Sequence, residues 1–370
     1  MDVLPRGHPL NVAGYERLAR EKLAPPVWDG IDEGAGDERT RSDNEAAFER
    51  WSLRPRFLVD LTGATTATTV LGTPVSMPLL VAPTGWQRLV HPEGEVATAR
   101  ASAEAGTVMC VASFTTSSLP EIAAVAPAAA RWFQLYPFTD DGVTRSLIEQ
   151  AVASDFHALV VTVDTPVPGR RERSLRHDSR IPAGIALPAL AELFPDPEGE
   201  KPSELGKAFS RTTTWSDLER FAGLSGLPIV VKGLLTPEDA ELACEHGAAG
   251  VFVSNHGGRQ LDGTPATLDV LSEIAEAVGD RAEVFLDGGV RRGNDVVKAL
   301  ALGARAAMIG RPALWGLAAD GREGVRGVLE LLKQEIAEGL MLVGCTSPED
   351  VRPGHVAPAT APRRSSDRSL

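Results

Sequence analysis

The sequence predicts an α/β protein built as a (β/α)8 TIM barrel, because strand-like and helix-like segments alternate along most of the chain. Eight short apolar runs occur at residues 77–82, 107–112, 131–136, 158–163, 227–231, 250–254, 282–286 and 304–309. Helix-like segments separate most of them, at residues 93–105, 118–126, 141–154, 236–246, 267–278 and 292–302. Several runs are almost continuously apolar, as expected for strands buried on both faces of a parallel sheet. Eight such strands in 370 residues favour a closed barrel over an open doubly wound sheet.

The ends of individual helices support this count of elements. Thr236 is expected to be an N-cap, with Pro237 at the first helical position and acidic residues after it. The same helix is expected to end at Gly247, and Gly303 ends the helix before the last strand. These signals divide the second half of the chain into the strand–helix units that a barrel requires.

The remaining segments are expected to be additions to one domain of residues 1–370. Residues 1–60 are expected to form an N-terminal helical cap, and residues 61–345 the barrel. An insertion at residues 181–212, after the fourth strand, is rich in proline, glycine and charged residues. It is long enough to be a mobile active-site cover, and a disordered surface loop is the alternative. Residues 356–370 are expected to be a disordered tail.

Composition excludes several classes of protein. The formal net charge of −13 argues against a nucleic-acid-binding surface. The three cysteines, Cys110, Cys244 and Cys345, lie far apart and have neither metal-ligand spacing nor a disulfide framework. No run reaches the roughly 18 apolar residues of a membrane span, and the N-terminus has no apolar signal core. We therefore expect a cytoplasmic protein that binds no nucleic acid, no membrane and no metal.

The segment at residues 251–262 is the most informative part of the chain. A buried-strand run ends there in a polar, glycine-rich turn that carries His256 and, three positions later, Arg259. Histidine can take a proton near neutral pH, and arginine can bind a carboxylate through two parallel hydrogen bonds. Together they predict a site that holds a small carboxylic acid beside a base.

Polar residues follow the other expected strands in the same way. In chain order they are Thr84, Ser113, Gln134 with Tyr136, Thr162 with Asp164, Lys232, Asp287, and Gly310 with Arg311. Because reactive groups in TIM barrels gather at the carboxyl ends of the strands, we expect these side chains to face one mouth. Lys232 is either a surface lysine or a cation beside a group that becomes negative during reaction. Arg170 and Arg171 are either a basic rim, or one of them completes a carboxylate clamp with Arg259.

The last two strand ends predict a phosphate site. Gly288 and Gly289 expose backbone N–H groups before a helix, and Arg291 adds a positive charge. Gly310 and Arg311 follow the neighbouring strand, and loops after strands seven and eight are the usual phosphate position in such barrels. The pattern is neither a P-loop nor the glycine fingerprint of a Rossmann unit.

Six short motifs occur in order along the chain. They are QLY at 134–136, TVDTP at 162–166, GRRE at 169–172, VKG at 231–233, SNHGGRQLDG at 254–263 and DGGVRRG at 287–293. These motifs resemble the FMN-dependent 2-hydroxy acid oxidase and dehydrogenase family, which includes glycolate oxidase, lactate oxidase and mandelate-oxidising enzymes. The resemblance extends over residues 28–345.

The resemblance implies catalytic and substrate-binding roles for five residues. His256 would be the catalytic base, also in contact with the substrate, and Asp164 would orient its ring. Arg259 and Arg171 would bind the substrate carboxylate. Tyr136 would hydrogen-bond near the reacting oxygen.

The resemblance also implies FMN as the cofactor, with Lys232 beside the flavin ring to stabilise its negative charge after reduction. The implied FMN-binding residues are Ala82, Pro83, Thr84, Ser113, Gln134, Tyr136, Thr162, Lys232, Ser254, Asp287, Gly288, Gly289, Val290, Arg291, Gly310 and Arg311. The enzyme would oxidise an (S)-2-hydroxy acid to a 2-keto acid and pass the electrons to oxygen or another acceptor. The family also suggests a homotetramer.

Two glycines depart from common family patterns. The family often has a tyrosine near the N-terminus that helps bind the substrate carboxylate, and Gly30 stands at that position. Loss of its hydroxyl weakens binding by about 1 kcal/mol but leaves room for a bulky, mandelate-like acid. Gly85 stands where oxidases of the family often have alanine, which leaves the electron acceptor open. A small lactate- or glycolate-type acid is the alternative substrate, and a flavin-binding barrel without turnover is the alternative of another class.

Overall fold

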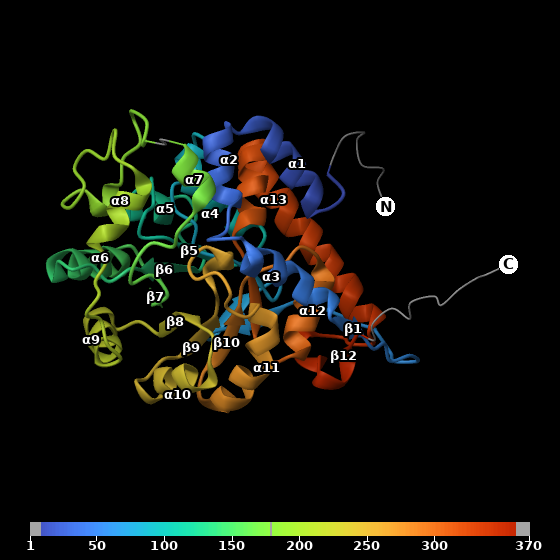
Figure 1. Cartoon of the computed structure of the whole chain (residues 1–370). Coiled ribbons are helices and arrows are strands. Elements are labelled where there is room, and N and C mark those ends of the chain that lie inside the picture. The colour runs from blue at the N-terminus through green and yellow to red at the C-terminus, as the bar shows by residue number, and fades with distance from the viewer. Residues whose placement is uncertain (1–8, 178–179, 360–370) are drawn as a thin grey trace.

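Eight parallel strands form a closed barrel at the centre of the protein (Figure 1). The structure, a computed structural model, describes residues 9–177 and 180–359. The barrel strands are β4 (Leu79–Val81), β5 (Met109–Val111), β6 (Arg131–Leu135), β7 (Ala158–Thr162), β8 (Ile229–Leu234), β9 (Gly250–Val253), β10 (Glu283–Leu286) and β11 (Ala306–Ile309). Each pairs with its neighbour in the chain, and β11 pairs with β4 to close the barrel. The predicted (β/α)8 architecture is confirmed, and every strand overlaps its predicted apolar run.

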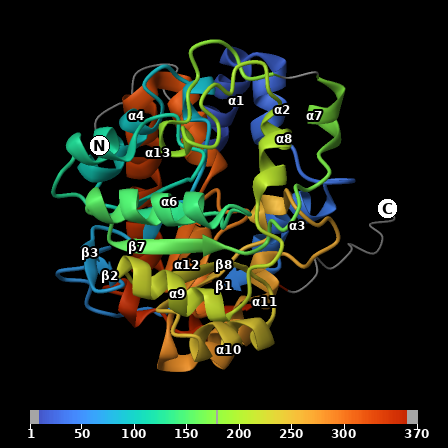
Figure 2. The same ribbon diagram turned by 90° about the vertical axis from the view of Figure 1, so that its left-hand side faces the viewer.

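Helices surround the barrel. Those that match predicted segments are α4 (Gly94–Glu104), α5 (Leu119–Ala124), α6 (Asp141–Ala153), α10 (Pro237–Glu245), α11 (Thr267–Val278) and α12 (Gly293–Ala301). Two more, α9 (Ser216–Ser225) and α13 (Arg311–Leu342), are not among the predicted segments. Figure 2 shows α6, α9 and α10 on one side of the barrel. Within the described residues, no helix has both the length and the apolar content needed to cross a bilayer.

Large apolar side chains fill the barrel interior. Trp132 and Phe285 are fully buried there, and their rings meet edge to face with centroids 5.2 Å apart. An antiparallel hairpin, formed by β2 (Thr68–Val70) and β3 (Thr73–Val75), adds its buried valines to this cluster. The hairpin packs at the amino ends of the strands, opposite the predicted site, so it closes the barrel floor without limiting access to the mouth.

The N-terminal cap contains three helices, in agreement with the expected helical cap. They are α1 (Val12–Lys22), α2 (Pro25–Asp32) and α3 (Arg39–Glu49). Helix α1 packs along α13, and α3 packs on the turn after β9 (Figure 1). Asn11 caps α1 by accepting from the backbone N–H of Gly14, a bond that stabilises the first turn. Helix α2 is thereby brought to the carboxyl end of the barrel.

The end of the described chain corrects one expectation. Strand β1 (Trp51–Leu53) pairs antiparallel with β12 (Val356–Pro358), so a disordered tail that starts at Val356 is wrong for its first three residues. The side chain of Val356 is 5% exposed and belongs to the main hydrophobic core. Residues 360–370, the rest of the expected tail, lie outside the described residues.

The insertion at residues 181–212 is packed against the barrel rather than extended into solvent. It contains short helical turns at Pro188–Leu190, α8 (Pro202–Leu205) and Gly206–Ala208. Its Leu187 and Phe209 are buried, and Phe209 forms a bridge with Phe138 at the end of β6. These contacts favour an active-site cover over a disordered surface loop, and the mobility of the cover stays a prediction.

Candidate active site

The predicted site residues gather at the carboxyl end of the barrel, at the strand ends or in the loops that follow them. The central group comes from three strands: Asp164 follows β7, His256 follows β9 and Tyr136 follows β6. His256 Nδ1 lies 3.0 Å from Asp164 Oδ1, and His256 Nε2 lies 3.4 Å from the hydroxyl of Tyr136. The carboxylate thus fixes one ring nitrogen and leaves the other directed toward the phenol, an arrangement suited to proton transfer.

Burial controls the charge state of this group. It lowers the pKa of His256 although the Asp164 carboxylate acts to raise it, so the imidazole is neutral at neutral pH and able to take a proton. Burial acts to raise the pKa of Asp164, but its interactions with His256 and with the Lys232 ammonium outweigh burial and hold that pKa below its usual value. Burial raises the pKa of Tyr136, which keeps its hydroxyl protonated as a hydrogen-bond donor.

Arg259 faces this group and is held by the cap helix α2. Its Nη1 donates to the carbonyl oxygens of Ile31 and Glu33, both at 3.1 Å, and its Nη2 donates to that of Gly30 at 2.9 Å. The C-terminal end of a helix attracts cations, which accounts for the contact. A guanidinium has five N–H groups, so two of them are left for a bidentate carboxylate. The sequence did not reveal that these carbonyls orient Arg259.

Three arginines make the mouth strongly positive. Burial first, and then the charges of Arg171 and Arg311, lower the pKa of Arg259 well below its usual value. Arg171 is the N-cap residue of α7 (Glu172–Arg176), and its side chain has no hydrogen bond or ion pair within the described part of the chain. Its neighbour Arg170 is exposed and pairs with Glu172 at 3.4 Å. Arg171 is therefore the residue of the pair that can join Arg259 on an anion.

Lys232 lies deep in the mouth and is 3% exposed. Its Nζ donates to Ser254 Oγ at 2.8 Å and lies 3.7 Å from Asp287 Oδ2. The interpretation of Lys232 as a surface lysine is therefore wrong. A buried ammonium with a single carboxylate at this distance is able to stabilise negative charge on a neighbouring group.

The turn after β10 has the geometry of an anion site, with one difference from the expectation. Gly288 and Gly289 have φ of 92° and 86°, and a Cβ on Gly289 would lie 2.0 Å from the carbonyl oxygen of Asn44, so only glycine fits there. Arg291 lies beside the turn and pairs with Glu45 at 2.8 Å. The guanidinium of Arg311, however, donates to three carbonyls, of Ile31, Glu33 and Gly257. Its backbone N–H, at the start of α13, is the part of Arg311 suited to a phosphate.

Unpaired polar atoms test whether FMN fits these residues. Buried polar groups in folded proteins almost always have hydrogen-bond partners, so each exception calls for an explanation. Among the described residues, the buried side-chain atoms without a partner are Gln134 Nε2, Thr162 Oγ1, Asp287 Oδ1, Arg291 Nε, Arg88 Nε, Trp132 Nε1 and Trp315 Nε1. The first four belong to the predicted FMN-binding set. An amide, a hydroxyl, a carboxylate and a guanidinium at the mouth match the polar edges and phosphate of FMN, so the residues fit this cofactor.

Aromatic rings form an apolar wall beside the base. Phe209 of the insertion stacks on Tyr136, with ring centroids 4.4 Å apart and planes 23° apart. Phe114 follows Ser113, and the centroid of its ring lies 5.8 Å from that of Phe209 and 6.0 Å from that of Tyr136. The predictions from sequence did not include Phe114 or Phe209, because an aromatic residue in a loop gives no sign of what it packs against.

A set of ion pairs joins the cap to the segment after β7, and the sequence analysis also missed it. Arg173 of α7 binds Asp29 at 3.1 Å, Asp32 at 3.0 Å and Glu38 at 2.8 Å. His177 Nε2 lies 2.7 Å from Asp29 Oδ2. We call this set of residues the clasp; it holds α2 beside α7 over the mouth (Figure 1). The acidic stretch at residues 29–38 and the arginines near 170–176 are the sequence signal that could have revealed it.

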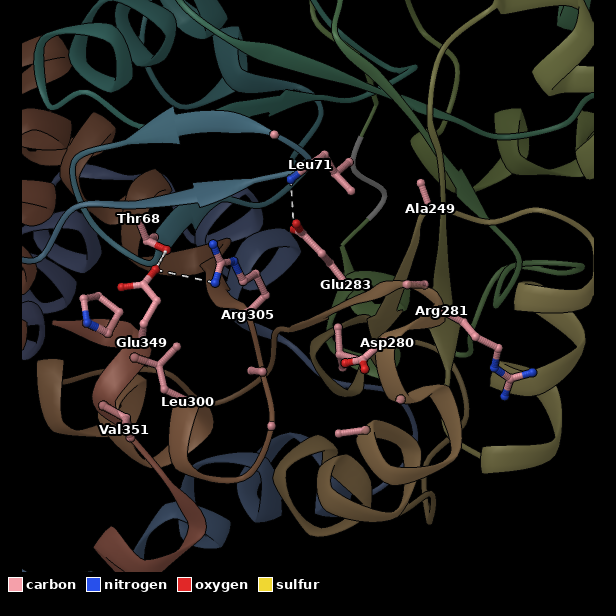
Figure 3. Close-up of a pocket in the computed structure, with 18 of the residues that line it drawn as sticks. Thr68, Leu71, Ala249, Asp280, Arg281, Glu283, Leu300, Arg305, Glu349 and Val351 are labelled. Atoms are coloured by element: carbon pink, nitrogen blue, oxygen red, sulfur yellow. Dashed lines mark hydrogen bonds and ion pairs between the residues drawn. The ribbon is translucent and has the colours of Figure 1, made fainter.

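A cleft of about 730 Å³ lies at the opposite end of the barrel, at the amino ends of β9, β10 and β11 (Figure 3). Several of its charged groups are already paired: Glu283 accepts from the backbone N–H of Leu71 at 2.9 Å, and Arg305 lies 3.5 Å from Glu349. Catalytic residues of TIM barrels lie at the other end, so this cleft is separate from the candidate site.

Comparison with known proteins gives consistent results. Residues 19–358 match the family described as FMN-dependent dehydrogenase. L-lactate oxidase of Nostoc sp. is 47% identical over 93% of this chain and 96% of its own length. Glycolate oxidase of Spinacia oleracea is 44% identical over 94% of this chain and 95% of its own.

A similar solved structure is mandelate oxidase with (S)-4-hydroxymandelic acid. The two chains share 39% sequence identity with a TM-score of 0.90, and the match covers 95% of this chain and 100% of that chain. The same enzyme with benzoyl-formic acid gives a TM-score of 0.86 at 39% identity and covers 95% of this chain and 98% of that chain. The similar proteins are thus named after acids of different size: lactate and glycolate are small, and mandelate is larger.

Proposed function

Because this chain belongs to the FMN-dependent dehydrogenase family, we propose that it oxidises a bulky, aromatic (S)-2-hydroxy acid to the 2-keto acid. The family is the one that the sequence motifs indicate, and FMN is its cofactor. One observation carries the proposal: the Asp164–His256–Tyr136 group faces Arg259 across the mouth. A base and a carboxylate anchor on the same mouth are what a 2-hydroxy acid requires.

The arginines bind the substrate. Arg259 offers the two N–H groups that α2 leaves unused, and Arg171 offers a guanidinium that has no partner among the described residues. Burial, and then the charge of Arg171, lowers the pKa of Arg259, and a bound carboxylate relieves the repulsion between the two arginines. The substrate is therefore oriented with its carboxylate toward the arginines and its hydroxyl-bearing carbon toward His256.

The base removes a proton as the carbon–oxygen single bond becomes a carbonyl. His256 Nε2 accepts that proton, and Asp164, held at Nδ1, stabilises the imidazolium that forms. Tyr136 donates its hydroxyl hydrogen to the substrate oxygen, since burial keeps the phenol protonated. When bound, the isoalloxazine ring of FMN supplies the acceptor for the two electrons. Lys232 supplies the buried positive charge beside Ser254 that offsets negative charge gained on reduction.

Two features favour a bulky acid. Apart from the neighbouring backbone of α2, no atom of the described residues lies within 4 Å of a Cβ built on Gly30, so the position of the family tyrosine is open. The stacked rings of Tyr136 and Phe209 present an apolar surface to a substrate side chain. A small acid of the lactate or glycolate type is the second candidate, favoured by the 47% identity with L-lactate oxidase.

Oxygen is the electron acceptor that we propose, because the sequence relatives in the comparison are named oxidases. The presence of glycine rather than alanine at position 85 does not by itself distinguish an oxidase from a dehydrogenase. A Cβ at Gly85 would lie 2.9 Å from the backbone oxygen of Phe114, so the packing of this chain disfavours alanine there for a steric reason.

Anaerobic titration of the yellow holoenzyme tests the proposal. Mandelate should bleach the flavin faster than lactate or glycolate at equal concentration, and readmitted oxygen should restore the colour with formation of peroxide. Faster bleaching by lactate would favour the second candidate. Restoration by a dye but not by oxygen would identify a dehydrogenase. A chain that binds FMN but is bleached by none of the acids would be a binding barrel without turnover.

A further inference from the structure

We propose that Asn44, on cap helix α3, positions the base His256 through Asn255. This inference rests on the proposed function, because it assumes that His256 takes the proton from the substrate. Asn44 is 2% exposed and Asn255 is 4% exposed. Neither side chain belongs to the predicted catalytic or FMN-binding sets, and each donates a hydrogen bond to the other.

The backbone that carries His256 is strained. His256, Gly257 and Gly258 have φ values of 58°, 64° and 74°, so three successive residues are in the left-handed region. Glycine adopts this conformation readily, but a histidine does so only when surrounding contacts hold it. The position of the imidazole therefore depends on groups that fix this turn from outside.

The two asparagines provide such a contact. Asn44 Nδ2 donates to Asn255 Oδ1 and Asn255 Nδ2 donates to Asn44 Oδ1, both at 2.8 Å. Asn255 Oδ1 also accepts from the backbone N–H of Gly258 at 3.1 Å, and so links the amide pair directly to the turn. Its Nδ2 donates in addition to the carbonyl oxygen of Pro265 at 3.1 Å. The amide of Asn255 thus spans the turn from its first residue to its last.

Asn44 is itself held firmly by close backbone packing. A Cβ on Gly258 would lie 2.5 Å from the backbone nitrogen of Arg41, and one on Gly289 would lie 2.0 Å from the carbonyl oxygen of Asn44. The backbone of α3 therefore rests directly on the turn after β9 and the turn after β10. Because α3 packs against both glycine turns, its position relative to the barrel is fixed. Asn44 on this helix can therefore hold Asn255 in place.

The base then has two separate supports. Asp164 orients the ring by its contact with Nδ1 at 3.0 Å, whereas Asn44 and Asn255 hold the backbone from which the ring projects. Asn44 is a positioning residue, since its amide bonds only to Asn255 and to the backbone N–H of Thr267 within the described chain. Loss of Asn44 should therefore change the rate of the chemical step more than the binding of the acid.

Two substitutions and one matched control test this role in the FMN-loaded full chain. Asn44→Ala removes the amide, and Asn44→Asp keeps its size and acceptor oxygens but removes the hydrogen donated to Asn255. The control is Thr40→Val on the same helix. Thr40 is 1% exposed and accepts from the backbone N–H of Gly263 at 2.8 Å, so it anchors the same loop beyond Arg259 without contacting Asn255.

We expect both Asn44 variants to lose roughly 10–100-fold in kcat with KM changed less than about threefold, because a misplaced base affects chemistry more than binding. Hydrogen exchange of the backbone amides at residues 255–258 should accelerate about tenfold, and bound FMN should be unchanged. Thr40→Val should leave both kcat and the hydrogen-exchange rate of residues 255–258 unchanged. Normal kcat and exchange in Asn44→Asp would overturn the proposal, as would an equal loss in Thr40→Val.

The exchange measurement also separates this proposal from the proposed function. If the unmodified enzyme oxidises no 2-hydroxy acid, the proposed function fails, but exchange in residues 255–258 still reports whether Asn44 holds the turn. Unchanged exchange in a folded Asn44 variant would refute the positioning role even if the enzyme is fully active.

Discussion

The pKa of His256 sets the pH range in which the site can work. Burial places this pKa below the ordinary value of 6.5, so the neutral base persists to lower pH than a free imidazole would. We expect the acid limb of kcat/KM to fall below pH 6.5. Asp164→Asn removes the carboxylate that raises the pKa, so the limb should move to still lower pH while kcat drops. Profiles of kcat/KM between about pH 5 and 9 measure both; a limb above 6.5 would contradict the assignment of His256 as a buried base.

Removal of the imidazole should separate cofactor binding from chemistry. His256→Ala is expected to retain FMN, since the FMN-binding set lies mainly at other strand ends, and to slow substrate bleaching by roughly 10²–10⁴-fold. Stopped-flow absorbance under anaerobic conditions gives the rate. His157→Ala, at an exposed histidine, is the control and should bleach normally. Fast bleaching by His256→Ala would exclude this residue as the base.

Gly30 allows a direct test of substrate size. Gly30→Tyr should lower the KM for lactate and raise that for mandelate, because the ring fills the open space and its hydroxyl can bond a carboxylate. Gly30→Phe is the matched control and should raise the KM for mandelate without helping lactate. The gain from the hydroxyl is expected to be about 1 kcal/mol, or roughly fivefold in KM. Steady-state kinetics on both acids decides; an unchanged KM for mandelate in both variants would contradict an opened pocket.

At the scale of secondary-structure elements, the clasp connects the cap helix α2 to the segment that carries Arg171. Arg173 makes most of the ion pairs of the clasp and is partly buried, whereas Arg176 on the same helix is exposed. Arg173→Ala should release both elements and raise the KM for the substrate about tenfold, because the carboxylate must then order them on binding. Arg176→Ala is the control, with an unchanged KM expected. Equal kinetics in the two variants would show that the clasp does not support Arg171.

The strands were predictable because most of their residues are apolar. Helix α9 was not, because its ten residues contain only three large apolar side chains, Leu218, Phe221 and Leu224. The hairpin of β2 and β3 was missed for a related reason. Its strands contain three residues each, too few for an alternating pattern to be recognised. Short elements therefore depend on tertiary packing, which local sequence does not report.

At the scale of the whole molecule, strand-end positions were predictable and contacts across the chain were not. The barrel rule places His256, Asp164 and Lys232 at one mouth from their order in sequence alone. The bonds from Arg259 to the carbonyls of α2 join residues more than 200 positions apart and involve backbone atoms, which carry no sequence signal. The homotetramer suggested by the family stays a prediction, although exposed Leu58 and Leu342 provide apolar surface for such contacts.

The pairing of β1 with β12 ties the end of the cap to the end of the described chain, so its loss should weaken the whole fold. Val356, opposite Leu53, is buried in the main core, and Val356→Ala should lower the free energy of unfolding by about 1–3 kcal/mol. Val152→Ala on α6 makes the same change at a side chain that is 41% exposed, and should cost less than about 0.5 kcal/mol. Guanidinium denaturation of the holoenzyme compares the two. Equal midpoints for both variants would mean that the terminal sheet adds nothing to the stability of the barrel.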